Sequence, residues 1–169
     1  MAIISTDIKR YLSGGAGNSD PNASLGGAIS VTELVSGTLH GLFDIVASAE
    51  ASAGDTEYRC YYVKNTHGTL TALSAKVWVQ TESPSGDTDE EIGLGTSAIN
   101  GVEQTVANEQ TAPAGVTFSQ ANGEGNALVI GDIPPGQHKA IWVKRTVSPG
   151  AAAANNDGPT IRFGCDTAA

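Results

Sequence analysis

Residues 57–80 read Glu-Tyr-Arg-Cys-Tyr-Tyr-Val-Lys-Asn-Thr-His-Gly-Thr-Leu-Thr-Ala-Leu-Ser-Ala-Lys-Val-Trp-Val-Gln. Aromatic and β-branched residues alternate with polar ones through both halves of this stretch, which is typical of half-buried β-strands. Between the halves, Asn65-Thr66-His67-Gly68 predicts a tight turn, because glycine tolerates the positive φ that short connections often need. We therefore expect a central hairpin of two strands in an all-β protein.

Shorter apolar runs, separated by turns rich in glycine, proline and asparagine, predict further strands on either side. These runs lie at residues 3–12, 28–35, 92–95, 115–120, 127–131, 138–147 and 160–165. The only helix-like material is at 39–53, where we expect a turn or two of helix near Ala47–Ala53, ended by Gly54. A short strand through Phe43–Val46 is the competing interpretation of part of that stretch.

Roughly eight or nine short strands with frequent turn signals favour an antiparallel two-sheet β-sandwich, either Ig-like or jelly-roll-like. The expected fold has long loops and at most one short helix. The 169 residues are predicted to form one domain, with residues 1–27 as a candidate N-terminal arm or loop.

Composition argues against several classes of partner. The net charge is −9 and the nine Lys and Arg residues are scattered, so nothing here could neutralise a run of phosphates in a nucleic acid. The N-terminus lacks the basic start and apolar run of a signal peptide, and no window approaches the apolar length of a membrane span. We expect a soluble chain made in the cytoplasm that binds neither nucleic acid nor membrane.

Catalytic and metal-binding patterns are not found in the sequence. The three histidines have no Cys or His neighbour at ligand spacing, no Gly-x-Ser-x-Gly motif occurs, and the glycine-rich loop at 13–27 lacks Gly-Lys-Ser/Thr. The acidic run Asp87–Glu91 could attract a hard cation, but a solvated turn is favoured. We therefore predict that the protein is not an enzyme and binds no cofactor or metal ion. No catalytic, cofactor-binding or metal-binding residue is assigned.

The two cysteines, Cys60 and Cys165, are too few to define a disulfide framework. Cys60 is expected to be a small core residue, and free thiols are favoured in a cytoplasmic product. A bridge within the chain and a bridge between subunits are the open alternatives.

Three long loops, at 13–27, 96–114 and 148–159, are rich in small and polar residues. Ordering such loops costs entropy, so long loops tend to be functional or disordered. We predict that they and the N-terminal arm contact other proteins in an assembly, although ordinary exposed loops are the alternative. The candidate contact residues are Tyr11, Asn18, Asp20, Pro21, Asn22, Leu25, Pro113, Pro149, Asn155, Asn156 and Asp157.

Several segments together resemble small structural proteins of tailed-bacteriophage virions. They are Asp7-Ile-Lys-Arg-Tyr-Leu-Ser-Gly-Gly-Ala, Asp20-Pro-Asn-Ala-Ser-Leu-Gly-Gly-Ala-Ile-Ser, Gly54-Asp-Thr-Glu-Tyr-Arg-Cys-Tyr-Tyr-Val-Lys-Asn, and Ala140-Ile-Trp-Val-Lys-Arg-Thr-Val with Asn155-Asn-Asp157. The resemblance spans most of the chain and implies a β-rich part of a virus particle, with no catalytic residue. It implies as partners the major capsid protein, neighbouring copies of this chain, or other virion proteins.

Two positions in a particle are consistent with that resemblance. The first is a capsid decoration (cement) protein, which clamps the major capsid proteins with its loops and ends. The second is a neck, tail or baseplate component. A third interpretation, from a different class, is a carbohydrate-binding or adhesion module that uses Trp78, Trp142 or Tyr61 as a stacking platform.

Overall fold

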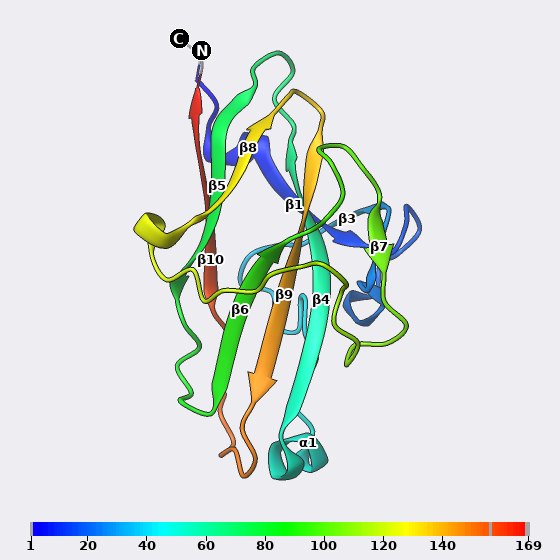
Figure 1. Cartoon of the computed structure of the whole chain (residues 1–169), viewed down its shortest axis with the longest axis vertical. Helices are drawn as coiled ribbons and strands as arrows, with labels where there is room; N and C mark the ends of the chain where they lie inside the picture. Colours follow the sequence, from blue (N-terminus) through cyan, green and yellow to red (C-terminus); the bar gives the residue numbers. More distant parts are fainter. Residues whose placement is uncertain (1, 156, 168–169) are drawn as a thin grey trace.

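The computed structural model describes residues 2–155 and 157–167, which form an all-β fold with antiparallel sheets (Figure 1). The larger sheet has the order β3 (Ile29–Glu33), β1 (Ile8–Ser13), β4 (Asp55–Asn65), β9 (His138–Val147), β6 (Thr88–Leu94). The smaller sheet has the order β10 (Thr160–Thr167), β5 (Ala72–Thr81), β8 (Leu128–Ile133), and β2 (Gly26–Gly27) pairs with β7 (Glu103–Thr105). The helical elements are η1 (Ser5–Asp7), η2 (Pro21–Ala23), α1 (Ser48–Ala53) and η3 (Glu124–Asn126).

The predicted all-β, sandwich-like fold with one short helix is confirmed. The main core lies between the two larger sheets, where alternate residues of β4 and β9, such as Val63 and Val143, meet Val77 and Val79 of β5. The helix α1 ends at Gly54, whose φ of 78° suits glycine, as the sequence predicted. Within the described residues, no helix has the length and apolar character needed to cross a membrane.

The predicted central hairpin is wrong. Both strands form, but β4 pairs with β1 and β9, whereas β5 pairs with β10 and β8 in the other sheet. The connection crosses between the sheets and is held by the buried Asn65, whose amide donates to Leu70 O (2.8 Å) and Ile133 O (2.9 Å). Alternation tells which residues share a face, but it does not say which strand lies alongside.

A third layer covers the outer face of the five-stranded sheet. There Cys60, Tyr62 and Trp142 are buried under Val106 and the loop residues Leu25, Val116 and Phe118. Ile29 of β3 and Tyr58 of β4 are partly buried in the same cluster. Loops that were expected to reach outward therefore serve partly as a lid on this sheet.

Several predicted strand boundaries also change. Residues 115–120 form no strand and pair with β6 through the isolated bridge Ile92–Ser119, and residues 43–46 form no strand either. The predicted acidic turn ends early, because β6 begins at Thr88. The predicted strand at 127–131 is only partly buried: Leu128 and Ile130 pack against the core, whereas Val129 between them is 72% exposed, because successive side chains of a strand point to opposite faces.

The two cysteines lie in different layers. Cys60 is buried under the outer lid, whereas Cys165 in β10 packs against the core between the sheets. Both are free thiols, as the sequence favoured.

Candidate contact surface

The glycine-rich first loop is held together by its own polar side chains. The amide of Asn18 donates to a backbone carbonyl of the loop (2.6 Å), and Asp20 caps η2 by accepting from the backbone N–H of Asn22 (2.9 Å). Asp20 and Asn22 are exposed, whereas Asn18 is half-buried. Of these three predicted contact residues, Asp20 and Asn22 offer most of their surface to solvent.

Four other predicted contact residues are turned partly or wholly inward. Leu25 packs under the outer lid, and Pro113 is buried. Pro21 and Tyr11 are half-buried, and the ammonium of Lys64 lies 5.9 Å from the Tyr11 ring centroid. Leu25 and Pro113 expose little surface because the loops that carry them cover the five-stranded sheet.

The last long loop presents two of its predicted residues and uses a third internally. Pro149 and Asn155 are exposed. Asp157 is half-buried and accepts a hydrogen bond from the backbone N–H of Ser85 (2.9 Å), which ties the loop to the turn before β6. Asn156 lies outside the described residues.

A different stretch, residues 31–45, exposes the most apolar surface. Seven large apolar side chains are exposed among the described residues, and four of them lie here: Val31 (76%), Val35 (59%), Leu39 (62%) and Ile45 (69%). We call residues 31–45 the apolar segment. Exposed apolar side chains that gather in one part of a molecule mark protein contact sites more often than ordinary solvated surface does.

The sequence patterns did not identify the apolar segment as a contact site. They predicted a short strand at 28–35 and helix-like material at 39–53. The available signal was that the apolar residues after position 33 fit neither a strand period nor a helix period, so no single face could bury them all.

The apolar segment starts in β3, an edge strand that pairs only with β1. The pairing is irregular: Tyr11 faces Glu33 and Ser13 faces Ile29, with a register shift between the two pairs. An edge strand leaves backbone donors and acceptors unpaired, and these can take up a further strand. In β3, the N–H of Val31 already donates to Ala16 O and that of Thr32 to the Ser30 hydroxyl, so the exposed apolar side chains are the main contact that this edge offers.

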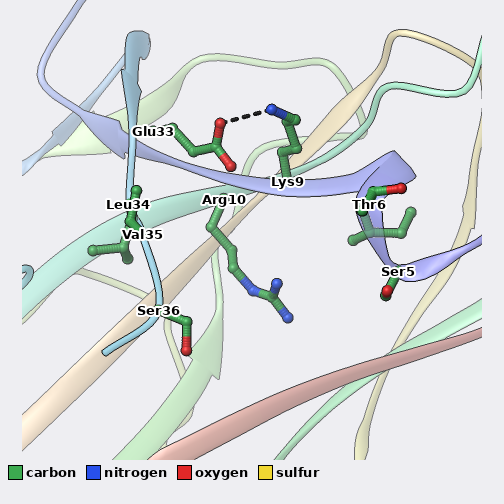
Figure 2. Close-up of a pocket in the computed structure, with 9 residues that line it drawn as sticks. Ser5, Thr6, Lys9, Arg10, Glu33, Leu34, Val35 and Ser36 are labelled. Atoms are coloured by element: carbon green, nitrogen blue, oxygen red, sulfur yellow. Dashed lines mark hydrogen bonds and ion pairs between the residues drawn. The ribbon is translucent and has the colours of Figure 1, made fainter. Parts of the chain in front are cut away.

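A pocket of about 300 Å³ lies beside this segment, between η1, β1 and the residues after β3 (Figure 2). Lys9 and Glu33 form an ion pair (2.7 Å) on one side of β1, and Figure 2 shows Arg10 pointing away to the other side. The lining residues are Ser5, Thr6, Ile8, Lys9, Arg10, Glu33, Leu34, Val35 and Ser36.

The aromatic side chains considered for carbohydrate stacking are buried, which corrects that expectation. Trp142 is fully buried, Tyr61 is 4% exposed and Trp78 is 6% exposed. Trp78 lies on the face of β5 that carries polar residues, but β10 covers its indole ring. Gly164 of β10 packs so closely on the ring that a Cβ added there would lie 3.1 Å from a ring carbon. No ring of these three offers a face to a sugar.

Three carboxylates do come together, at the end of β4. One oxygen each of Asp44, Glu57 and Glu109 lies within 4.8 Å of the others. Cationic side chains already pair with these carboxylates: two N–H groups of Arg145 donate to Oε2 of Glu57, and the fully buried Arg59 donates to Glu109. Two guanidinium groups thus balance two of the three carboxylate charges, which makes the cluster a structural ion network, not a metal site.

Phe43 closes this ion network from above. Its ring centroid lies 4.7 Å from the Arg145 guanidinium carbon and 5.6 Å from that of Arg59. An aromatic ring this close to two cations contributes cation–π attraction. The network therefore anchors the end of the apolar segment to the large sheet.

Glu103 organises the loop between β6 and β7. Its carboxylate accepts from the backbone N–H groups of Thr96 (3.2 Å) and Ser97 (2.9 Å). Burial raises the pKa of Glu103, but these hydrogen bonds outweigh it and lower the pKa to about 2. Lys139 donates to the carbonyls of Gly95 and Ser97 beside it.

The acidic run at 87–91 does not converge on one point. Asp87 accepts from Ala152 N (3.0 Å), Asp89 from the Gln120 amide (2.8 Å), and Glu91 pairs with Lys144. Glu90 is buried and accepts from the Ser83 hydroxyl (2.6 Å). Each carboxylate has its own protein partner, so the run forms no cation cage, and its middle is a strand in place of the expected solvated turn.

Comparison of the chain with protein-family models, with curated proteins and with solved structures finds no match. The functional argument therefore depends on the residues and geometry described above.

Proposed function

We propose that this chain is a non-enzymatic structural protein of a tailed-phage virion, and that it is a capsid decoration protein. In this role it binds the assembled major-capsid lattice and neighbouring copies of itself, and it resides in the virion. The resemblance in sequence suggests the particle, and the all-β fold is compatible with it.

The observation that carries a binding role is the apolar segment. It presents Val31, Val35 and Leu39 in and after the edge strand β3, so a partner could bury apolar side chains at the edge of the large sheet. The polar residues Asp20, Asn22 and Asn155 are exposed elsewhere and would add rim contacts.

The mechanism follows from mass action. A protein that binds the assembled lattice but not its free subunits stabilises the assembly in proportion to its occupancy. Repetition over many copies multiplies a modest gain at each site. The acidic surface, with a net charge of −9, keeps the free protein soluble and away from packaged nucleic acid.

The first experiment locates and counts the chain in purified virions. Mild chaotrope stripping followed by gel densitometry should release many copies from intact heads, and the stripped heads should burst at a lower temperature. A few copies retained with isolated tails would replace the decoration role by the neck, tail or baseplate role. Absence from particles would contradict the proposal altogether.

The double variant Val31→Ser/Leu39→Ser tests the contact surface. Both side chains are exposed, so the urea midpoint of the free protein should stay unchanged, whereas binding to stripped heads should weaken about tenfold through lost apolar burial. Val129→Ser, which removes an equally exposed valine from β8, is the matched control and should bind normally. Equal binding by both variants would place the contact elsewhere.

A further inference from the structure

Arg10 is a half-buried cation that has no hydrogen-bond or ion-pair partner among the described residues. Its neighbours on the same face of β1, Ile8 and Leu12, are 7% and 2% exposed, so the Arg10 stem follows the edge of the core. In the part of the chain that the structure describes, no hydrogen bond or ion pair reaches its guanidinium. The nearest carboxylate across β1 and β3 is Glu33, and Lys9 holds it on the opposite side of the strand (Figure 2).

Arg10 differs from Arg162, the other arginine without an ion pair among the described residues, because Arg162 is exposed on β10 whereas Arg10 is half-buried and lines a pocket. Acidic residues outnumber Lys and Arg by 18 to 9. The two arginines of the ion network each bond a carboxylate, as do Lys76 and Lys144, whereas Lys139 donates to backbone carbonyls. Because carboxylates are in excess, a cation left without one in a pocket indicates a position reserved for a group from outside the chain.

The walls of the pocket indicate what kind of group this is. Ser5, Thr6 and Ser36 bring hydroxyl groups that can donate to an oxyanion, and Leu34 and Val35 supply apolar surface. Arginine presents several donors in a planar fork that matches a carboxylate. The volume of about 300 Å³ is at the lower end of ligand pockets, which run from about 300 to 1,000 Å³, and suits one side chain with its neighbours.

We propose that this pocket receives a carboxylate side chain from an extended segment of the partner protein, with the carboxylate on Arg10 and flanking apolar residues on Val35 and Val31. The inference deepens the proposed function and rests on it for the partner's identity. Continuity favours a protein segment over a free anion, because Val35 lines the pocket and also belongs to the apolar segment. Arg10 thereby selects the partner by charge, and the apolar segment supplies area.

The test uses the full-length protein and two capped tripeptides, Val-Glu-Val and Val-Gln-Val, followed by amide and arginine side-chain NMR shifts at low salt. The glutamate peptide should shift the NMR signals of the Arg10 Nε–H and the Ser36 amide. The glutamine peptide should bind at least about tenfold more weakly, as expected for loss of a charge-assisted hydrogen bond. Equal binding of the two peptides, or no shift with either, would overturn the proposal.

Variants assign the effect to the pocket. Arg10→Gln should abolish the preference for glutamate, and Arg162→Gln, which neutralises an exposed arginine of β10, should keep it. Unchanged urea midpoints verify that both variants fold. A titration with inorganic phosphate separates the sources of negative charge: phosphate binding that depends on Arg10, without peptide binding, would replace the partner carboxylate by a free anion and overturn the inference.

Binding to stripped heads separates this inference from the proposed function. If the native protein binds heads and Arg10→Gln binds about tenfold more weakly, both stand. If both proteins bind equally well, the carboxylate pocket is wrong and the decoration role survives. If the peptide preference holds but the native protein binds no heads, the pocket stands and the decoration role fails.

Discussion

Glu103 and Glu90 are both buried, at 3% and 2% exposure, yet their surroundings act on them in opposite directions. For Glu103, hydrogen bonds from the loop at 96–97 overcome burial and hold the pKa at about 2. For Glu90, burial is the largest influence and raises the pKa above its usual value, with the Ser83 hydroxyl opposing it. One carboxylate therefore stabilises the folded state when ionised, and the other destabilises it.

Substitution by glutamine should show this difference directly. At pH 7, Glu103→Gln should lower the free energy of unfolding by about 2 kcal/mol, because charge-assisted hydrogen bonds to the loop are lost. Glu90→Gln should raise it by about 1 kcal/mol, because one Glu90 oxygen is buried without a partner and its charge is unfavourable there. Urea unfolding followed by fluorescence measures both changes.

The pH dependence has a definite sign for each residue. The contribution of Glu103 is present above pH 4.5 and is lost as the pH falls towards 2, so the deficit of Glu103→Gln should shrink in that window. Glu90 binds its proton more tightly in the folded state, so the advantage of Glu90→Gln should shrink as the pH falls from 7 towards 4.5. Glu124→Gln, at an exposed ion pair, should change little at any pH. A loss of stability in Glu90→Gln at pH 7 would contradict this account.

At the scale of elements, the pairing of β2 with β7 is what holds the outer lid on the large sheet. Gly26 has a φ of 93°, and a Cβ there would overlap the carbonyl oxygen of Gln104 on the paired strand. Its backbone N–H donates a hydrogen bond to the Ser13 hydroxyl oxygen (3.0 Å), which fixes the strand against β1. A side chain at position 26 can be accommodated only if the two strands separate.

Gly26→Ala should therefore lower the free energy of unfolding by about 2–4 kcal/mol, through strain and loss of the strand pair. In Gly26→Ala, amide hydrogen exchange should accelerate relative to the native protein at residues 103–106, and by less in β9. Gly125→Ala is the control, because a Cβ there meets no atom within 4 Å and its φ is not positive. Equal midpoints for the two variants would mean that the lid is not tied by this pair.

At the scale of the whole molecule, the two larger sheets share one core and should unfold together. Trp78 reports on the smaller sheet and Trp142 on the larger, and both are buried. The variant Trp78→Phe keeps only the tryptophan fluorescence of the larger sheet, and Trp142→Phe keeps only that of the smaller sheet. Within each variant, the urea midpoint from fluorescence should agree with that from circular dichroism within about 0.2 M, as a two-state transition requires. Separate transitions would divide the chain into two units.

How much of the structure could be predicted from the sequence differs between these scales. Strand existence and face followed from local alternation, because successive Cβ atoms point to opposite sides of a strand whatever lies beside it. The stretches around β4, β5 and β9 were recognised on this basis, and Gly54 marked the end of α1. Both are properties of short segments.

Only the tertiary structure decided which strands pair with one another and which charged side chains form ion pairs. The strands at 55–65 and 72–81 follow one another but lie in different sheets, since burial of both inner faces outweighs the short path of a hairpin. The same holds for the candidate site, where Lys9 and Arg10 are adjacent in the sequence. The register of β1 against β3 places Glu33 in an ion pair with Lys9, whereas Arg10 lines the pocket without a carboxylate partner among the described residues. Charge and apolar character are written in the sequence, but whether a side chain finds a partner depends on contacts between residues far apart in the chain.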